Sequence, residues 1–90
     1  MSLRDRFYLI VKYPVITEKS VLLLERQGKL TLIVDRKATK NDVKKVMEEK
    51  FDVRVKKVNI LITPKGEKKA IVTFIDKDDA IKVATALGVL

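Results

Sequence analysis

The stretch 53–75 constrains the fold of this 90-residue chain more than any other part of the sequence. Apolar and polar residues alternate through its first half, which predicts a β-strand, but the alternation slips by one residue at Lys56 and Lys57. A strand can keep one face buried across such a slip only if an extra residue bulges out, so a β-bulge is expected there. The sequence TPKG at 63–66 is typical of a tight turn. The second half has apolar residues on both faces, which predicts a central return strand.

Positive charge is concentrated on this hairpin. The whole chain has 20 Lys and Arg against 12 Asp and Glu, a formal net charge of +8. Residues 53–69 hold six of those cations and a single acid, Glu67, whereas residues 70–90 hold two cations and three acids. A basic ribbon of this kind favours a polyanionic ligand, because neutralised phosphates release their counterions. The alternative is a solvated strand edge that lysines protect from aggregation.

Composition argues against an enzyme. The chain has no histidine and no cysteine, which removes the usual general base and the imidazole and thiolate ligands of metals. The carboxylate pairs Glu48–Glu49 and Asp78–Asp79 are neighbours in helical patterns, and neighbours on a helix do not face each other. We therefore expect no catalytic residue, no metal, no cofactor and no small-molecule substrate.

The length predicts a single domain, residues 1–90, because a chain this short buries one core. Hydrophobic residues make up 47% of the sequence, which is typical of a folded protein. No apolar run approaches the roughly twenty residues of a membrane-spanning helix. Direct insertion into a membrane is therefore not expected.

The first half of the chain predicts a strand, a helix and a second strand. Residues 7–11 alternate in polarity and predict the first strand. Thr17 is a good N-cap for a helix over about 18–26, and Gly28 is a typical stop. Residues 29–35 predict the second strand.

The second half predicts two further helices around the hairpin. Thr39 opens one helix, with Asp42 placed for a near capping box, and Asp76 caps the last helix, which Gly88 ends. The order is then β-α-β-α-β-β-α. The hairpin's return strand fits most simply between the strands that flank the second helix, antiparallel to both. The fold class predicted is α+β, a small, mostly antiparallel four-stranded sheet with helices packed on it, in a split-βαβ style.

Several short motifs resemble those of the universal large-subunit ribosomal protein family numbered twenty-three. Residues 13–20, YPVITEKS, resemble the P-x-x-[ST]-E-K opening of that family. The similarity continues in order through DRKATK at 35–40, FDV at 51–53, VN at 58–59 and KKAIVT at 68–73. Many bacterial members carry a long basic loop that reaches into the peptide tunnel, whereas here the loop is only about 63–68. The chain is thus similar to the short, archaeal form of the family.

The resemblance implies a structural protein of the large ribosomal subunit, in the cytoplasm, that binds ribosomal RNA near the exit of the peptide tunnel. It also implies neighbouring large-subunit proteins, signal recognition particle and the translocation channel as partners, with Glu18 exposed for factor docking. The charge of the hairpin and the resemblance together predict sixteen RNA-binding residues: Lys12, Pro14, Thr17, Lys19, Ser20, Arg36, Lys37, Lys40, Lys44, Arg54, Lys56, Lys57, Asn59, Lys65, Lys68 and Lys69.

Other classes fit less well. An RNA recognition motif needs exposed aromatics for base stacking, but Ala70 and Val72 stand at the equivalent positions of KKAIVTFI. An acylphosphatase-like enzyme needs an arginine-bearing glycine loop, and residues 12–20 contain neither residue type. The alternative is a stand-alone basic RNA-binding or protein-interaction module on a ferredoxin-like sheet. The apolar residues Val89 and Leu90 are compatible with a protein-interaction module, but such a module does not explain the basic hairpin.

Overall fold

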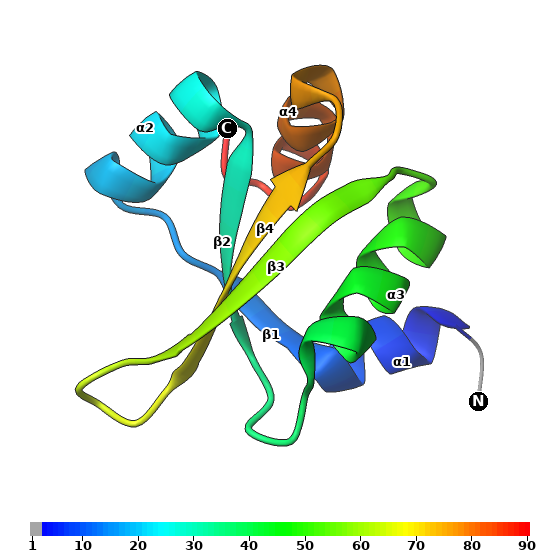
Figure 1. Cartoon of the computed structure of the whole chain (residues 1–90), viewed down its shortest axis with the longest axis vertical. Helices are drawn as coiled ribbons and strands as arrows, with labels where there is room; N and C mark the ends of the chain where they lie inside the picture. The colour runs from blue at the N-terminus through cyan, green and yellow to red at the C-terminus, as the bar shows by residue number, and fades with distance from the viewer. Residues whose placement is uncertain (1–2) are drawn as a thin grey trace.

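The computed structural model describes residues 3–90, with side chains from Arg6 onward. The elements in chain order are α1 (Leu3–Ile10), β1 (Val11–Pro14), α2 (Glu18–Gln27), β2 (Lys29–Val34), α3 (Lys40–Phe51), β3 (Val55–Ile62), β4 (Lys68–Phe74) and α4 (Lys77–Ala86). The strands form one sheet in the order β1-β2-β4-β3, and each neighbouring pair is antiparallel (Figure 1). The predicted α+β class, with helices packed on a four-stranded sheet, is confirmed.

The return strand β4 lies in the middle of the sheet, as predicted. Val72 is paired with Leu30 of β2 on one side and with Val58 of β3 on the other. The predicted bulge is also present, since the β3–β4 register shifts between Val55 and Lys57. The shift restores the alternation, so that the buried residues on either side of the bulge share one face.

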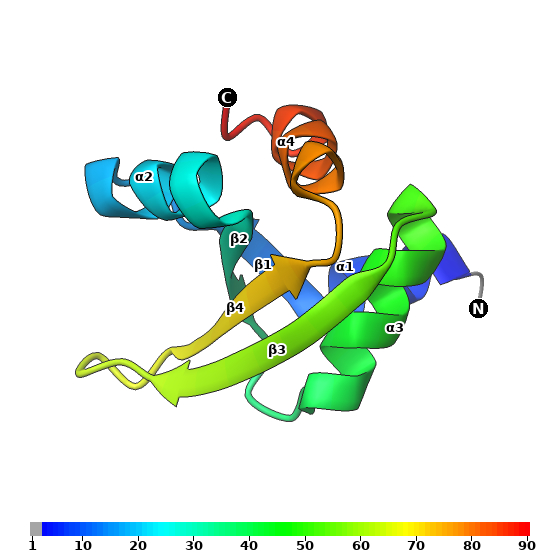
Figure 2. The ribbon, with the colours of Figure 1, turned by 45° about the horizontal axis from the view of Figure 1, so that its top comes forward.

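One face of the sheet is covered by helices. Its residues continue into a core to which all helices contribute: Leu24 from α2, Met47 from α3, Val83 from α4 and Phe7 from α1 are each at most 2% exposed. The turn between β3 and β4 projects into solvent at the end of the sheet far from α1, α3 and α4 (Figure 2). The hairpin therefore has one end in the core and one end in solvent.

The other face is only partly covered, and here the sequence pattern was misleading. We call this second face the open face. Successive side chains of a strand point to opposite faces, so the residues that alternate with the buried ones lie on it: Lys29, Thr31, Ile33, Lys57, Asn59, Leu61, Lys69, Ile71 and Thr73. We expected apolar residues to pack on both sides of the central strand. Ile71 is only half-buried, however, and Ile75, just beyond β4, is 63% exposed. The segment 13–17 and the start of α2 cover only the β2 side of this face, so its β3 side meets solvent.

The predicted strand at 7–11 is wrong, because residues 3–10 form the helix α1 and the strand β1 begins only at Val11. Phe7, Ile10 and Val11 face the core together, whereas Leu9, which a strand would bury beside Phe7, is 58% exposed. The Phe7 ring packs edge-on against Phe51 of α3, with 5.6 Å between ring centroids. A short apolar run does not distinguish helix from strand, and this contact with a distant helix decides between them.

The predicted helix starts and stops are confirmed. The Thr17 hydroxyl accepts from the Ser20 amide at 3.1 Å, and the Ser20 hydroxyl accepts from the Thr17 amide at 2.8 Å. Thr39 and Asp42 form the equivalent capping box of α3. That arrangement holds the pKa of the Asp42 carboxyl below its ordinary value, chiefly through the hydrogen bond from the Thr39 amide. Gly28 ends α2 in the left-handed conformation, with φ of 64°.

Candidate nucleic-acid interface

Basic side chains from three strands come together on the open face. Lys57 of β3 and Lys29 of β2 both lie opposite Thr73 of β4, so the three residues form one row across the sheet. Lys69 lies in another row, between Ile33 and Leu61. Lys29 was missed in the sequence, although the alternation of 29–35 places it on the side of Ile33. The predicted Asn59 lies between these rows, half-buried.

Lys68 differs from its neighbour Lys69 because it points to the covered face. Its ammonium donates hydrogen bonds to the Ala38 carbonyl at 2.5 Å and to the Arg36 carbonyl at 3.3 Å. An ammonium has three donors, so one is left for a further partner. Lys68 thus ties the loop between β2 and α3 to the base of the hairpin.

Replacing Lys68 with Ala is expected to lower the free energy of unfolding by about 1–3 kcal/mol, because two carbonyls lose a charged donor. Lys69→Ala removes the same side chain from the open face and should change stability by no more than about 0.5 kcal/mol. Urea unfolding of both variants measures the difference. Equal stabilities would mean that the Lys68 ammonium does not hold the loop.

At the start of α2, the predicted residues divide into exposed and buried ones. Thr17, Glu18 and Lys19 are exposed, whereas Ser20 is 7% exposed and its hydroxyl lies 2.8 Å from the Val15 carbonyl oxygen. Ser20 therefore belongs to the helix cap and the chain turn before it. Lys19 lies beside a hollow of about 220 Å³ on the open face, which Lys69 also lines.

A second cluster forms where β1, the β2–α3 loop and the hairpin turn meet. Lys12, Arg36, Lys65 and Lys68 line a hollow of about 230 Å³ there, together with the acid Glu67. These cations come from three separate stretches of the sequence: β1, the β2–α3 loop and the hairpin. Other predicted residues are exposed but line neither hollow: Lys37, Lys40, Lys44, Arg54, Lys56.

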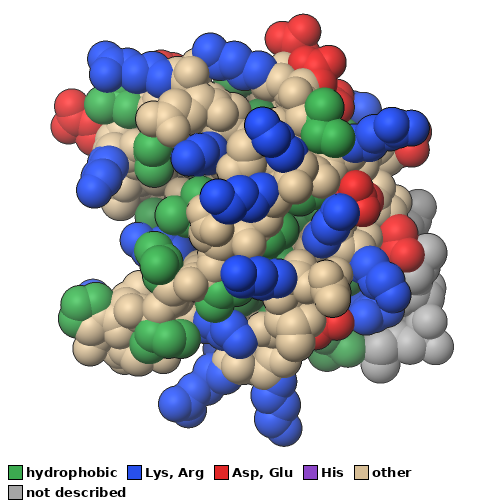
Figure 3. All heavy atoms as spheres, in the orientation of Figure 1, with side chains coloured by type: hydrophobic (Ala, Val, Ile, Leu, Met, Phe, Trp, Pro, Cys, Tyr) green, Lys and Arg blue, Asp and Glu red, His purple; other side chains and the backbone are tan. Residues whose placement is uncertain are grey.

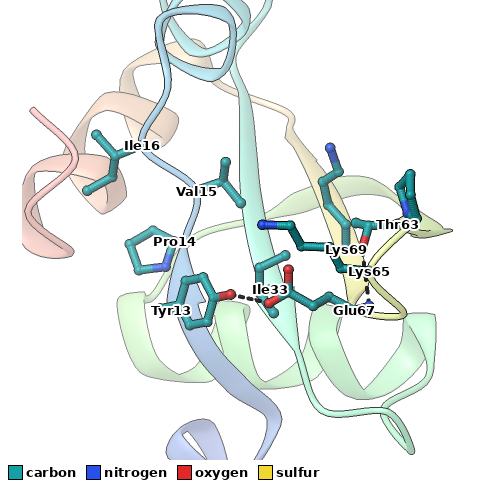
Figure 4. Close-up of a pocket in the computed structure, with 10 residues that line it drawn as sticks. Tyr13, Pro14, Val15, Ile16, Ile33, Thr63, Lys65, Glu67 and Lys69 are labelled. Carbon is teal, nitrogen blue, oxygen red and sulfur yellow. Dashed lines mark hydrogen bonds between the residues drawn. The ribbon is translucent and has the colours of Figure 1, made fainter.

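Between these two hollows lies a larger, apolar one of about 420 Å³ (Figure 4). Tyr13, Pro14 and Ile33 line it from the sheet, and Lys65 and Lys69 border it from the hairpin. Figure 4 shows the Tyr13 hydroxyl directed at Glu67, to whose carboxylate it donates a hydrogen bond. That bond to a carboxylate raises the pKa of the Tyr13 phenol above its ordinary value. Pro14 was predicted from the sequence as a contact, whereas Tyr13 was not, although it stands between Lys12 and Pro14 at the end of a short edge strand.

The surface carries its charge unevenly. In the view of Figure 3, Lys and Arg side chains are spread over most of the surface, including the middle and the lower edge, whereas Asp and Glu side chains are fewer and lie mainly at the left, at the top and in the right half. Among residues 6–90, whose side chains the structure describes, no cluster of acidic side chains could hold a metal ion. Over the same range, no helix is both long and apolar enough to span a membrane.

The fold and the charged open face define a small, basic α+β domain. Residues 9–86 match the family model described as Ribosomal protein L23. Over 80 residues the chain is 50% identical to the large ribosomal subunit protein uL23 of Methanococcus aeolicus, covering 89% of this chain and 93% of that relative. It is 47% identical over 81 residues to uL23 of Pyrobaculum aerophilum, covering 90% of this chain and all of that relative.

The chain therefore belongs to the ribosomal protein L23 family. This confirms the family inferred from the motifs between residues 13 and 73, and both relatives are archaeal, as the short hairpin loop suggested. Membership also confirms that the chain is a structural ribosomal protein and not an enzyme. Family membership, rather than the lack of a membrane helix, places it in the ribosome and hence in the cytoplasm.

Proposed function

We propose that this protein binds large-subunit ribosomal RNA near the exit of the peptide tunnel, next to other large-subunit proteins, and offers a docking surface there for factors that meet the nascent chain. The observation that carries the RNA part is the open face, where Lys29, Lys57 and Lys69 lie on one side of the sheet and the core helices on the other. Phosphates can approach this side without disturbing the core.

The RNA interface is broader than the hairpin alone. Lys19 from α2 lines one hollow, Lys12 from β1 and Arg36 from the β2–α3 loop line another, and both hollows adjoin the apolar one. A surface that presents cations from several elements at fixed spacing suits the backbone of a folded RNA, which is recognised by shape and phosphates. Lys40 and Lys44 are exposed on α3, on the covered side of the sheet, so they would contact RNA that also reaches that side.

Crosslinking tests this interface directly. Wild-type protein bound to in vitro transcribed large-subunit RNA of Methanococcus aeolicus is treated with a short lysine-to-RNA crosslinker, and the modified peptides are identified by mass spectrometry. We expect crosslinks at Lys57 and Lys69 and few at Lys82, which is exposed on α4. A crosslink pattern concentrated on α4 would remove the open face from the interface.

The docking part of the proposal rests on Glu18, which is exposed at the first position of α2. Glu18→Ala is expected to leave incorporation into the large subunit intact and to weaken recruitment of an exit-site factor, since it removes an exposed charge and no core contact. Co-sedimentation of signal recognition particle with reconstituted subunits measures recruitment. Glu25→Ala on the same helix is the matched control, because Glu25 is also an exposed glutamate. If Glu18→Ala blocks incorporation instead, Glu18 faces the RNA and the docking role is wrong.

A further inference from the structure

Tyr13 is an aromatic side chain that neither the core nor the charge pattern explains. Phe7 and Phe74 are buried in the core, and Phe51 packs on Phe7. Tyr8 is exposed on α1, at the end of the molecule away from the hairpin turn (Figure 1). Tyr13 is 47% exposed on the edge strand β1, paired with Ile33, and so lies on the open face. Among the residues that the structure describes, it is thus the one aromatic ring on the open face.

The ring is held in place at the wall of the apolar hollow. The Tyr13 hydroxyl donates a hydrogen bond to the Glu67 carboxylate. Glu67 is in turn held by the turn: the Glu67 amide donates to the Thr63 hydroxyl at 3.1 Å, and the Thr63 amide donates to the Glu67 carbonyl at 2.8 Å. The hollow of about 420 Å³ has an apolar floor, since Ile33 is 5% exposed there. Pockets of about 300–1,000 Å³ accept small ligands, so a single heterocyclic base with its sugar fits this one.

The two smaller hollows lie on either side of the apolar one. The first, lined by Lys12, Arg36 and Lys65, shares Ile33 and Glu67 with it. The second, lined by Lys19 and Lys69, shares Val15 and Lys69 with it, and the two smaller hollows share no residue with each other. An apolar site thus lies between two cationic ones.

The second cationic hollow also contains a buried polar atom without a partner. Thr31 is 4% exposed, and its hydroxyl makes no hydrogen bond. A buried hydroxyl without a partner is unfavourable, so at Thr31 the protein's own hydrogen bonds leave a polar group of this wall unsatisfied.

From this arrangement we propose that the three hollows bind one unstacked nucleotide of a folded RNA, with its base against Tyr13 in the apolar hollow and its two flanking phosphates in the cationic hollows. The inference rests on the proposed RNA-binding function and names the part of the RNA that this site takes. A base has the π-face that stacks on a tyrosine, and its phosphates match the cations on both sides. The Glu67 carboxylate keeps acceptor capacity beyond the Tyr13 bond, so it favours a base that presents an amino group at this edge.

The test uses the shortest fragment of Methanococcus aeolicus large-subunit RNA that binds the wild-type protein in the presence of excess transfer RNA. Tyr13→Ala should raise the Kd by about 5- to 100-fold through lost stacking, with no change in the slope of log Kd against log salt. Tyr13→Phe keeps the stacking ring and loses only the hydrogen bond to Glu67, so it should weaken binding much less than Tyr13→Ala. Tyr13→Leu keeps apolar bulk without the ring and should bind nearly as weakly as the Ala variant. Tyr8→Ala, a change of an exposed tyrosine outside the site, should leave the Kd unchanged.

Single abasic substitutions along the same RNA fragment test the site with the wild-type protein, so this test does not depend on whether the Tyr13 variants fold. One position should weaken binding to the wild type and have no further effect on Tyr13→Ala, since both changes remove the same contact. If no abasic position is coupled to Tyr13, or if Tyr13→Leu binds like the wild type, the apolar hollow holds no base and the inference is wrong while RNA binding stands. If the wild type binds no fragment more tightly than transfer RNA, the proposed function itself fails.

Discussion

Val72→Asp is expected to abolish the native fold. Val72 is fully buried at the centre of the sheet, between Leu30 and Val58. A carboxylate at this position finds no partner, and a buried unpaired charge is among the few changes that destabilise by more than about 4 kcal/mol. A domain of this size has a total stability on the order of 5–15 kcal/mol. Far-UV circular dichroism and thermal melting should therefore show a largely unfolded chain at 37 °C or a transition lowered by tens of degrees.

The matched control is Ile62→Asp, at the exposed end of the same hairpin. Ile62 is 67% exposed and lies opposite Lys68. The same change in polarity should alter the free energy of unfolding by no more than about 0.5 kcal/mol there. If Val72→Asp melts like the wild type, β4 is not the central strand in solution, and the division into a covered and an open face is wrong as well.

The double variant Lys57→Ala/Lys69→Ala should keep the melting temperature and lose RNA affinity. Both side chains lie on the open face, outside the core. If each contacts one phosphate, the slope of log affinity against log salt should fall by about 0.7–0.9 per residue. Filter binding to the same large-subunit RNA fragment at several salt concentrations measures both the affinity and the slope.

Two further variants make this result interpretable. Lys82→Ala removes an exposed cation from α4 and should leave the slope unchanged. Charge reversal at Lys65, in the hairpin turn, should weaken RNA binding without lowering the melting temperature, since Lys65 is exposed and contributes nothing to the core. An unchanged slope in the double variant would exclude the open face from the RNA interface.

The hairpin shows which features can be predicted from local sequence patterns and which cannot. Its strand alternation, the bulge at Lys56–Lys57 and the turn at 63–66 could all be predicted, because each depends on residues close together in the chain. The place of β4 between β2 and β3 followed from its apolar residues on both faces. The same argument overestimated the packing on the second face, because the described helices gather on the other side and leave Ile71 half-buried.

For the candidate interface, the sequence predicted which segments carry positive charge but not what each basic side chain contacts. Lys68 and Lys69 are adjacent and chemically identical, yet one donates to the carbonyls of a loop and the other lies on the open face. Alternation places them on opposite sides of a strand. Only the structure places the 35–39 loop within reach of Lys68. Tyr13 was missed for the same reason, since its hollow is formed by β1 and by a turn more than fifty residues later in the chain.

What the sequence by itself determined is therefore the set of local features: the caps at Thr17 and Thr39, the stop at Gly28, the basic hairpin and, through short motifs, the family. Each follows from the backbone preferences and hydrogen bonds of residues a few positions apart. The tertiary structure alone decided that residues 3–10 form a helix against Phe51, that one face stays open, and that Tyr13 lies between two groups of cations. These features depend on contacts between distant segments, and such contacts exist only once the sheet has formed.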